Sequence, residues 1–529
     1  MTLAPIRTAR GTAAMAATVD GIATEAALAM LRRGGSAADA AIAANAVLTV
    51  TLPSQCGLGG DLFALVQPGP QAPVESLVSA GRAGSGASAA ALRDAGFATV
   101  PAEDDIRAVT IPGCADGWIA LHERHGRLPL ADVLAPAIHY AVDGFPVSRY
   151  MAGKLVRRAA HSPAARAMLV DGALREGQRT RRPETGRVLG ELAAGGRRGF
   201  WEGTFGAALL AAGDGLFSSD DVARSQAEWA PPVSIDAFGH RLWTPGAPSQ
   251  GYLALAAAAI AESIGVPEDP DDPRWPHLLV EAMRQAAHDR PERLHDGADV
   301  GAALAPDRIA ALASRIDLER TTDTGDAYRP GGTTYLAVVD ADGMAVSLIQ
   351  SNCMSFGSGI ELEGTGIWLQ DRGIGFSLVP GHPNELAPGA RPAHTLAPML
   401  VTAGGAFAAA LGTRGGDTQP QILLQLLART LVARQDPAEA VAAGRWLLRG
   451  LEDETSFNTW GFEGRVRVEI EGQAPESWLA GLRDRGHRVE RVAAFGHPFG
   501  HAQLVRRRGD GVLEGAADPR STAESAAGY

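Results

Sequence analysis

The chain has 529 residues, of which 46% are hydrophobic and 20% are charged, so its composition is that of a globular protein with enough length for a large core. Its 48 lysines and arginines against 60 aspartates and glutamates give a net charge of −12, which argues against nucleic acid as a partner. Three scattered cysteines, Cys56, Cys114 and Cys353, are too few for a disulfide framework or a cysteine metal site, so we expect neither a metal nor a cofactor.

The N-terminal stretch contains Arg7 and Arg10, but the small residues after them make a poor hydrophobic segment for secretion. The longest apolar run, residues 253–261, is far too short to span a bilayer. Both observations predict a cytoplasmic enzyme without a membrane segment.

The first third of the chain predicts two helices and a strand. Residues 19–33 have helical periodicity, and a second helix begins at Ser36, which forms a capping-box-like pair with Asp39. The glycines at 57–60 precede a predicted strand at 62–66. Their spacing fits neither a P-loop nor a dinucleotide fingerprint, which favours a structural turn over a phosphate site.

The middle of the chain predicts helices and then a linker. A Pro-Ser-Gln-Gly stretch at 248–251 precedes an apolar helix, and residues 277–288 form an amphipathic one. Residues 317–332 are polar, charged and rich in glycine and proline, which is typical of an exposed linker.

A hairpin follows directly after that linker. Residues 333–339 and 344–350 are predicted strands, and the Asp-Gly turn at 340–343 is a strong hairpin signal. The first strand is apolar on both faces, so we expect a sheet that is covered on both sides.

The hairpin opens with the sequence Gly331-Gly332-Thr333-Thr334, which has two interpretations. On local pattern it is a flexible loop that leads into a β-branched strand. Alternatively, the Thr333 hydroxyl attacks the Gly332 carbonyl and the chain cuts itself, since Gly332 has no Cβ to hinder the approach. The new α-amino group has an ordinary pKa of about 7.7–8.0 and could then act as the base for the same hydroxyl.

The last third contains a proline- and glycine-rich loop, residues 378–391, which is long enough to act as a lid. Gly415-Gly416 then precede a helix. Their backbone N–H groups could bind a developing oxyanion, or the pair could be a plain turn, and the local pattern favours neither.

Across its length the chain resembles the γ-glutamyltransferase family of N-terminal nucleophile hydrolases. The resemblance rests on these segments, which occur in family order: RRGGSAADAAIAANAVLTV, GLGGDLF, VTIPGCADGW, AVDGFPVS, PSQG, VEAMRQAAHDR, GGTTYLAVVD, FGSGI, RPAHTLAPML, GTRGGD and GAADPRS. It implies an α+β fold, a four-layer αββα sandwich formed by two chains of one self-cleaved precursor.

The resemblance implies a cut between Gly332 and Thr333, giving a large chain of residues 1–332 and a small chain of residues 333–529. Thr333 is then both the self-cleaving and the catalytic nucleophile. Ser351 matches a second hydroxyl that hydrogen-bonds the nucleophile, where threonine is usual in the family. Gly415 and Gly416 match the glycine pair of the oxyanion hole.

The chain also departs from the members that act on glutathione. Gly375 occupies the position of an aspartate that binds the substrate ammonium, Arg82 is displaced by about two positions, and His394-Thr395 replace a serine pair. The segments SLIQSN, RGIGFSL, HTLAP and GGDTQPQ are instead similar to a branch with oxamate amidohydrolase-like and cephalosporin acylase-like proteins. Arg82, Arg372, His394 and Thr395 are therefore predicted to bind a small polar or anionic acyl group, and the alternative is a surface or structural role.

The resulting prediction is an N-terminal threonine amidohydrolase that acts on a small amide through an acyl-threonine intermediate. Its alternatives are a γ-glutamyl transpeptidase or glutathione hydrolase, a hydrolase of C–C bonds in a biosynthetic pathway, and an uncleaved binding protein. The expected partners are the amide substrate and the two chains of the precursor, with association into a homodimer of heterodimers left open.

Overall fold

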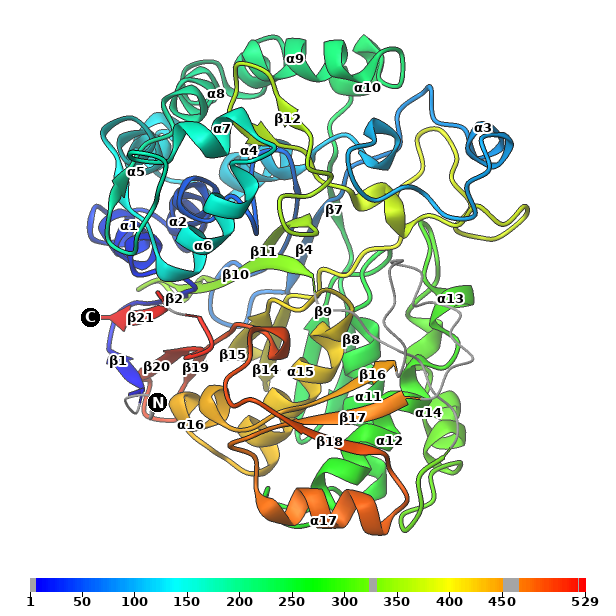
Figure 1. The fold of residues 1–529 in the computed structure, drawn as a ribbon. Helices are drawn as coiled ribbons and strands as arrows, with labels where there is room; N and C mark the ends of the chain where they lie inside the picture. The colour runs from blue at the N-terminus through cyan, green and yellow to red at the C-terminus, as the bar shows by residue number, and fades with distance from the viewer. Residues whose placement is uncertain (1–5, 323–330, 451–465, 522) are drawn as a thin grey trace.

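The computed structural model describes residues 6–322, 331–450, 466–521 and 523–529. Two seven-stranded sheets lie face to face in the middle of the molecule, and helices cover the outer face of each (Figure 1). Every strand pair within these two sheets is antiparallel. The arrangement is the predicted four-layer αββα sandwich.

The first sheet carries the predicted hairpin at its centre. Its strands, in spatial order, are β21 (Ser525–Gly528), β2 (Met15–Thr18), β10 (Gly332–Val339), β11 (Ala345–Cys353), β3 (Asp61–Gln67), β4 (Glu75–Ser79) and β7 (Ala227–Ala230). The strands of the second sheet, in spatial order, are β1 (Ala9–Gly11), β20 (Leu513–Ala517), β19 (Ala502–Arg507), β15 (Ala406–Thr413), β14 (Met399–Ala403), β9 (His240–Thr244) and β8 (Val233–Ala237).

Apolar side chains from the facing sides of the two sheets form the central core. Phe63, Tyr335 and Ile349 of the first sheet pack in one cluster with Leu400 and Val505 of the second. The alternate residues of β10, such as Leu336 and Val338, pack outward against helices. All eight residues of β10 are buried, which confirms the prediction of a strand covered on both faces.

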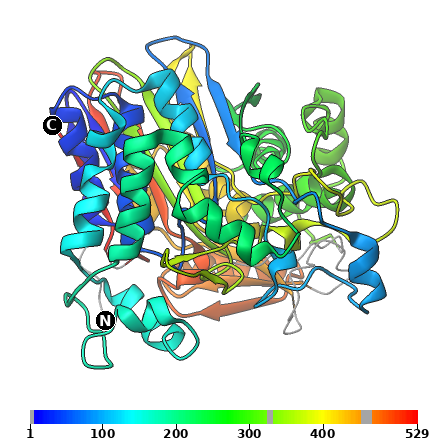
Figure 2. The ribbon, with the colours of Figure 1, turned by 90° about the horizontal axis from the view of Figure 1, so that it is seen from above.

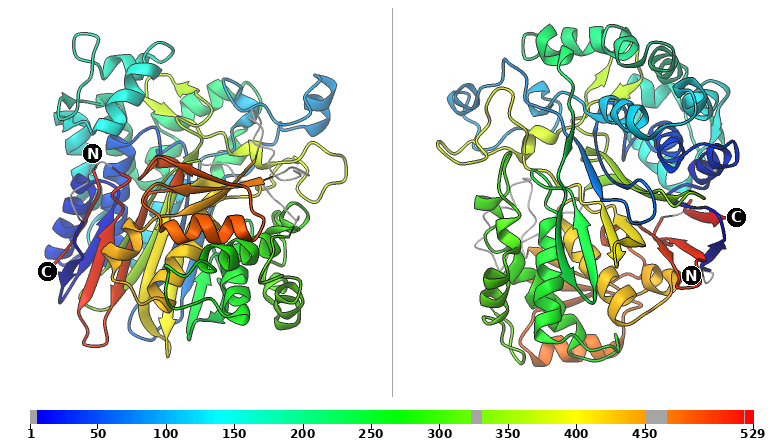
Figure 3. Two further views of the ribbon diagram at one scale, coloured as in Figure 1. Left: turned by 60° about the horizontal axis from the view of Figure 1, so that its bottom comes forward. Right: turned by 180° about the vertical axis from the view of Figure 1, so that it is seen from behind.

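Helices from the N-terminal part cover the first sheet, and later helices cover the second (Figure 3, right panel). The first cover consists of α1 (Gly21–Arg32), α2 (Ala37–Thr51), α4 (Cys114–His125), α5 (Leu130–Asp143), α6 (Arg149–Arg158), α7 (Pro163–Ala167), α8 (Pro183–Trp201), α9 (Thr204–Gly213) and α10 (Ser219–Ala223). The second cover consists of α11 (Tyr252–Ile264), α12 (Trp275–Ala287), α14 (Pro306–Ala313), α15 (Gln419–Leu427), α16 (Pro437–Ala442) and α17 (Glu476–Asp484).

Smaller elements complete the fold. A three-stranded sheet of β16 (Trp446–Gly450), β17 (Val466–Glu471) and β18 (Val489–Val492) packs on the second cover. The loop at 378–391 lies beside α3 (Ala89–Asp94) at the edge of the molecule, where Arg93 hydrogen-bonds Glu385 (Figures 1 and 2). Within the described ranges, no helix combines the length and apolar character needed to cross a membrane.

The hairpin turn ties β10 and β11 to helix α2. One Asp340 carboxylate oxygen accepts hydrogen bonds from the backbone N–H groups of Asp342 and Met344, while the other accepts from Ala37 at the start of α2. The predicted capping box of Ser36 and Asp39 is present at the same helix end. Since all 15 residues of α2 are buried, this helix fixes the hairpin against the core.

The prediction of an exposed linker at 317–332 is wrong at its C-terminal end. Residues 317–320 are exposed, but Gly331 and Gly332 are buried. Gly332 already pairs with Cys353 in the sheet, so the strand begins one residue earlier than predicted. Residues 323–330 of that linker lie outside the described part of the chain.

Candidate active site

Thr333 lies at a β-bulge where the register between β10 and β11 shifts. Gly332 pairs with Cys353, whereas Thr334 pairs with Gln350, so Thr333 faces a stretch of β11 with one extra residue. A bulge of this kind turns side chains away from the regular alternation of a strand. Here it brings the Thr333 hydroxyl to 3.2 Å from the Ser351 hydroxyl, to which it donates.

Ser351 connects this hydroxyl to the peptide bond before it. Its own hydroxyl donates a hydrogen bond of 2.5 Å to the Gly332 carbonyl oxygen and accepts one of 2.7 Å from the Cys353 N–H. Thr333 and Ser351 are 2% and 1% exposed, so these bonds form in a nearly water-free setting. The arrangement polarises the Gly332 carbonyl and holds a hydroxyl next to it.

Gly416, the second residue of the pair Gly415-Gly416, lies against Gly331, which precedes this peptide. A Cβ on Gly331 would be 3.1 Å from the Gly416 Cα and 3.5 Å from its nitrogen, so the two backbones are in close contact. Gly416 has a φ of 55°, a conformation that favours glycine, and it starts the turn that leads into α15. Just before the pair, the Arg414 Nε donates to the Gly331 carbonyl at 3.0 Å.

Arg372, His394 and Thr395 form a second part of the site. The Arg372 Nη1 donates to the Thr395 hydroxyl at 3.2 Å, and the side chain is almost entirely buried. Its Nε and Nη2 have no hydrogen-bond partner among the described residues. Guanidinium N–H groups that are buried without acceptors are costly for a folded protein unless a ligand supplies the missing acceptors.

His394 is held by protein groups through both ring nitrogens. Its Nδ1 accepts from the Leu396 N–H at 3.3 Å, so its Nε2 carries the proton and donates to Asp61 at 3.1 Å. Burial and the positive charge of Arg372 lower the pKa of His394 to about 4, although Asp61 opposes this shift. The ring is therefore neutral at ordinary pH and serves to fix the segment that holds Thr395.

Arg82 lies apart from this group. Its guanidinium faces β7, with Nη1 at 3.4 Å from Gln226 and Nη2 at 3.5 Å from Glu228. Burial lowers its pKa to about 10, and the charges of Arg391 and Arg224 add to the effect. The backbone next to it is connected to the site, since the Gly81 N–H donates to Asp61 at 2.9 Å.

Three residues that the sequence interpretation did not single out hold the site together. The Gln55 Oε1 accepts from the Thr333 backbone N–H at 3.0 Å. The Gln250 Nε2 donates both to the Gly416 carbonyl and to the Thr395 carbonyl, at 2.9 and 3.1 Å. The Asp61 carboxylate accepts hydrogen bonds from the backbone of Gly81 and Gly113 and from the side chains of Gln370 and His394. Asp61 and Gln250 lie in the family segments GLGGDLF and PSQG, which mark the regions but not these residues, and Gln55 lies in a turn with no signal of its own.

Contacts link the two parts of the site. Burial raises the pKa of the Cys353 thiol and the charge of Arg372 opposes this, and Cys353 pairs with Gly332 in the sheet. On the other side, Gln250 joins the Thr395 backbone to the glycine pair.

The cluster of His277, Glu281 and His487 has side chains of metal-ligating type. The His277 Nδ1 lies 2.8 Å from the His487 Nε2, which fits a hydrogen bond between the rings. Both Glu281 oxygens already accept hydrogen bonds from Arg284, Thr321 and Thr322. Because its carboxylate is saturated and faces a cation, this cluster fits a structural network better than a metal site.

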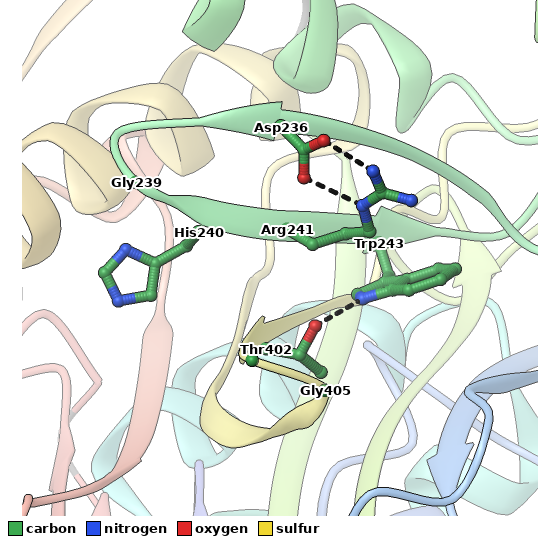
Figure 4. Close-up of a pocket in the computed structure, with 8 residues that line it drawn as sticks. Asp236, Gly239, His240, Arg241, Trp243, Thr402 and Gly405 are labelled. Atoms are coloured by element: carbon green, nitrogen blue, oxygen red, sulfur yellow. Dashed lines mark hydrogen bonds and ion pairs between the residues drawn. The ribbon is translucent and has the colours of Figure 1, made fainter.

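A cavity of about 390 Å³ lies at the end of the second sheet where β8 turns into β9 and β14 turns into β15 (Figure 4). It is lined by Asp236, Gly239, His240, Arg241, Trp243, Thr402, Gly404 and Gly405. This cavity adjoins the turn before β15, whereas the glycine pair follows the opposite end of the same strand. Eight residues of strand span about 25 Å, so this cavity is separate from the site at Thr333.

The four-layer sandwich is the fold of N-terminal nucleophile hydrolases, an assignment that the solved structures support. The crystal structure of cephalosporin acylase from Bacillus halodurans superposes with a TM-score of 0.89 at 31% sequence identity, covering 100% of this chain and 98% of that one. The chain belongs to the gamma-glutamyltranspeptidase family, whose model matches residues 23–528. It is therefore an enzyme of a hydrolase and acyltransferase family.

Two curated relatives match over nearly their whole length. The oxamate amidohydrolase proenzyme of Klebsiella pneumoniae is 36% identical over 96% of this chain and 97% of its own. The glutathione hydrolase-like YwrD proenzyme of Bacillus subtilis is 34% identical with the same coverage. These relatives confirm the family and the N-terminal nucleophile amidohydrolase class that the sequence predicted.

Proposed function

We propose that the chain cuts itself between Gly332 and Thr333 and then uses Thr333 to hydrolyse a small amide that carries a carboxylate. The large chain would comprise residues 1–332 and the small chain residues 333–529. The observation that carries the proposal is the run of hydrogen bonds from Thr333 through Ser351 to the Gly332 carbonyl. The relatives named as proenzymes support a processed precursor.

Self-cleavage begins when the Thr333 Oγ attacks the Gly332 carbonyl carbon, which the Ser351 hydroxyl polarises. The C–N bond breaks, the nitrogen takes up the hydroxyl proton, and an ester joins Gly332 to Thr333. Water then hydrolyses the ester, which leaves a carboxylate on Gly332 and a free α-amino group on Thr333. The close contact between Gly331 and Gly416 supports a role for the glycine N–H groups in stabilising the oxyanion.

In the mature enzyme the same groups would act on substrate. The Thr333 Oγ attacks the substrate carbonyl while its own amino group takes the proton, and that proton leaves with the amine product. The acyl-threonine ester is then hydrolysed by water, with the amino group as the base. The N–H groups of Gly415 and Gly416 are assigned to the oxyanion, and Gln250 holds the Gly416 carbonyl so that the pair keeps its orientation.

The unpartnered nitrogens of Arg372 support an anionic acyl group. A carboxylate would give the Arg372 Nε and Nη2 their missing acceptors in the bidentate geometry that arginine prefers. The oxamate amidohydrolase among the relatives has a substrate of this type in its name. We assign Thr395 to hold the guanidinium, His394 to hold Thr395, and Arg82 to the outer part of the site.

Transfer of a γ-glutamyl group is the second candidate, because glutathione hydrolases are among the relatives. A γ-glutamyl substrate also carries an ammonium group. Gly375 offers no carboxylate to bind it, and the buried charge of Arg372 would repel it if the group bound nearby. These observations favour hydrolysis of a compact anionic amide over γ-glutamyl transfer.

Thr333→Val tests self-cleavage, and Thr334→Val is its matched control. Both changes keep the β-branched shape and remove one buried hydroxyl. We expect two bands of unequal size on a denaturing gel for the wild type and for Thr334→Val, and one band without activity for Thr333→Val. A single band for active wild-type enzyme would overturn the proposal and leave an uncleaved form as the working protein.

Three substrates test the anionic acyl group: oxamate, its neutral relative oxamide, and γ-glutamyl-p-nitroanilide. We expect kcat/KM for oxamate to exceed that for oxamide by about tenfold or more, because a charged hydrogen bond contributes about 1.5–3 kcal/mol. Faster turnover of γ-glutamyl-p-nitroanilide than of oxamate would assign the enzyme to the second candidate.

We also propose a cytoplasmic location, which the three buried cysteines without disulfides support. Association of two cleaved pairs into a homodimer of heterodimers stays a prediction that gel filtration would test.

A further inference from the structure

The turn between α2 and β3 places Gln55 beside the nitrogen of the proposed nucleophile. Gln55 is 2% exposed, and its Oε1 accepts from the Thr333 N–H at 3.0 Å. In the uncut chain that N–H belongs to a peptide bond. After the cut proposed above, the same nitrogen becomes the amino group that acts as the base.

The turn that carries Gln55 is fixed to the strand opposite Thr333. The Gln55 carbonyl accepts from the Asn352 N–H at 3.2 Å, and the Ser54 carbonyl accepts from the Phe356 N–H at 3.1 Å. The Asn352 side chain donates to the Pro53 carbonyl at 3.3 Å. These three contacts flank the bulge at Ser351, so the Gln55 side chain and the Thr333 hydroxyl are held within one rigid unit.

We infer that Gln55 is a positioning residue, which orients the α-amino group of Thr333 so that its lone pair faces the Thr333 hydroxyl. The inference rests on the proposed function. A neutral amine has two N–H bonds and one lone pair, and it can rotate about its bond to the Cα. Donation of one N–H to the Gln55 Oε1 restricts this rotation and leaves the lone pair free for the hydroxyl proton.

The neutral amide of Gln55 suits this task better than a carboxylate. The amine must be unprotonated when it accepts the hydroxyl proton, and it must give that proton to the leaving amine afterwards. A carboxylate at this position would stabilise the ammonium form and raise the pKa of the amine by about 1–3 units. An amide accepts the same hydrogen bond without adding a charge.

The experiment compares Gln55→Glu and Gln55→Leu with the wild type, with rates expressed per cleaved molecule as counted from the small-chain band. For the wild type we expect kcat/KM to rise with pH through the pKa of the amine. Gln55→Glu should move this midpoint up by about one unit or more. Gln55→Leu should lower kcat about tenfold or more with little change in KM, because orientation is lost while substrate contacts remain.

Gln350→Leu is the matched control. Gln350 is another buried glutamine of the same region, and it hydrogen-bonds both backbone groups of Gly57 without contacting the Thr333 nitrogen. Its loss should lower the thermal stability and leave the pH midpoint where it is.

Unchanged pH profiles and unchanged kcat in both Gln55 variants would overturn the inference. So would a folded Gln55→Leu chain that stays entirely uncut, since Gln55 would then serve the cut and not the amine. Activity that survives in Thr333→Val would instead contradict the proposed function itself.

Discussion

Two buried arginines show the difference between a structural cluster and a candidate site. Arg520, near the C-terminus, is 1% exposed. It hydrogen-bonds the carboxylates of Glu471 and Asp518 and the carbonyls of Val441 and Ala443. Each of its three nitrogens has a partner, and its two carboxylates raise its pKa although burial opposes them.

Arg372 is equally buried, but within the described residues its side chain donates to the neutral Thr395 hydroxyl, and its other two nitrogens have no hydrogen-bond partner. The hydrogen bonds of the folded chain do not satisfy this group, and burying N–H groups without acceptors costs free energy. The two arginines therefore differ in hydrogen bonding and not in burial, and the N–H groups of Arg372 without acceptors are the feature that fits the proposed anion site.

The largest expected effect separates the two arginines by stability. Arg520→Met leaves the buried Glu471 carboxylate without its ion-pair partner and Asp518 with Arg445 alone, which should cost about 3–5 kcal/mol of unfolding free energy. Arg372→Met removes a buried charge that has no hydrogen-bonded carboxylate partner, so it should leave stability unchanged or raise it. Urea unfolding of both variants in the uncut Thr333→Val chain would measure this. Equal losses would show that Arg372 is a structural residue as well.

The two clusters should also respond to pH in opposite directions. Burial raises the pKa of Asp371 to about 6, against the bond from the Met354 N–H and the charge of Arg372. For Asp518 burial acts upward too, but Arg445 and Arg520 outweigh it and lower the pKa below its usual value of 3.8.

A raised carboxyl pKa means that the folded chain keeps a proton that the unfolded chain releases. The contribution of Asp371 to stability therefore falls as pH rises from about 4 to about 6, by about 3 kcal/mol for a shift of two units. Asp371→Asn should remove this loss, so the unfolding free energy of the variant relative to the wild type should rise between pH 4 and pH 7. The contribution of Asp518 is present above pH 4 and lost in acid, so Asp518→Asn should be least stable, relative to the wild type, at neutral pH. Urea unfolding at several pH values tests both signs.

Local signals in the sequence were sufficient for the framework around Thr333. The capping box at Ser36, the Asp-Gly turn after β10 and the apolar faces of β10 each depend on neighbouring residues, and the structure confirms all three. The four-layer fold came from the family resemblance, because no local pattern specifies which sheets face each other. The linker was wrong at Gly331 and Gly332 because glycines occur in exposed turns and in buried bulges alike.

The sequence was less informative where the site depends on distant contacts. Gln55 precedes Thr333 by 278 positions, and no spacing rule connects a glutamine in a turn with a backbone nitrogen that far along the chain. The sequence placed Arg82 and Arg372 together as anion-binding candidates. Only the fold shows that Arg82 faces Gln226 and Glu228, while Arg372 has nitrogens without a partner.

A smaller effect is expected on substrate selectivity. Arg372→Met should lower kcat/KM for oxamate about ten- to a hundredfold and leave the slower rate for oxamide nearly unchanged, because only the anionic substrate loses a charged partner. Arg82→Met serves as the comparison. Since Glu228 is already close to its guanidinium, we expect a change of less than about fivefold. A larger loss of kcat/KM for oxamate in Arg82→Met than in Arg372→Met would show that Arg82, and not Arg372, binds the anionic group.

The smallest effect concerns the one hydrogen bond that Arg372 makes to Thr395. Thr395→Val keeps the shape of the side chain and removes its hydroxyl, so the guanidinium loses its 3.2 Å partner and can rotate in the site. We expect kcat/KM for oxamate to fall about two- to fivefold, with the loss in KM, and Thr395→Ser to restore it, since one neutral hydrogen bond contributes about 1 kcal/mol. If Thr395→Val instead lowers the unfolding free energy as much as Arg520→Met does, then the bond between Arg372 and Thr395 is a structural contact, and Arg372 is a structural residue like Arg520.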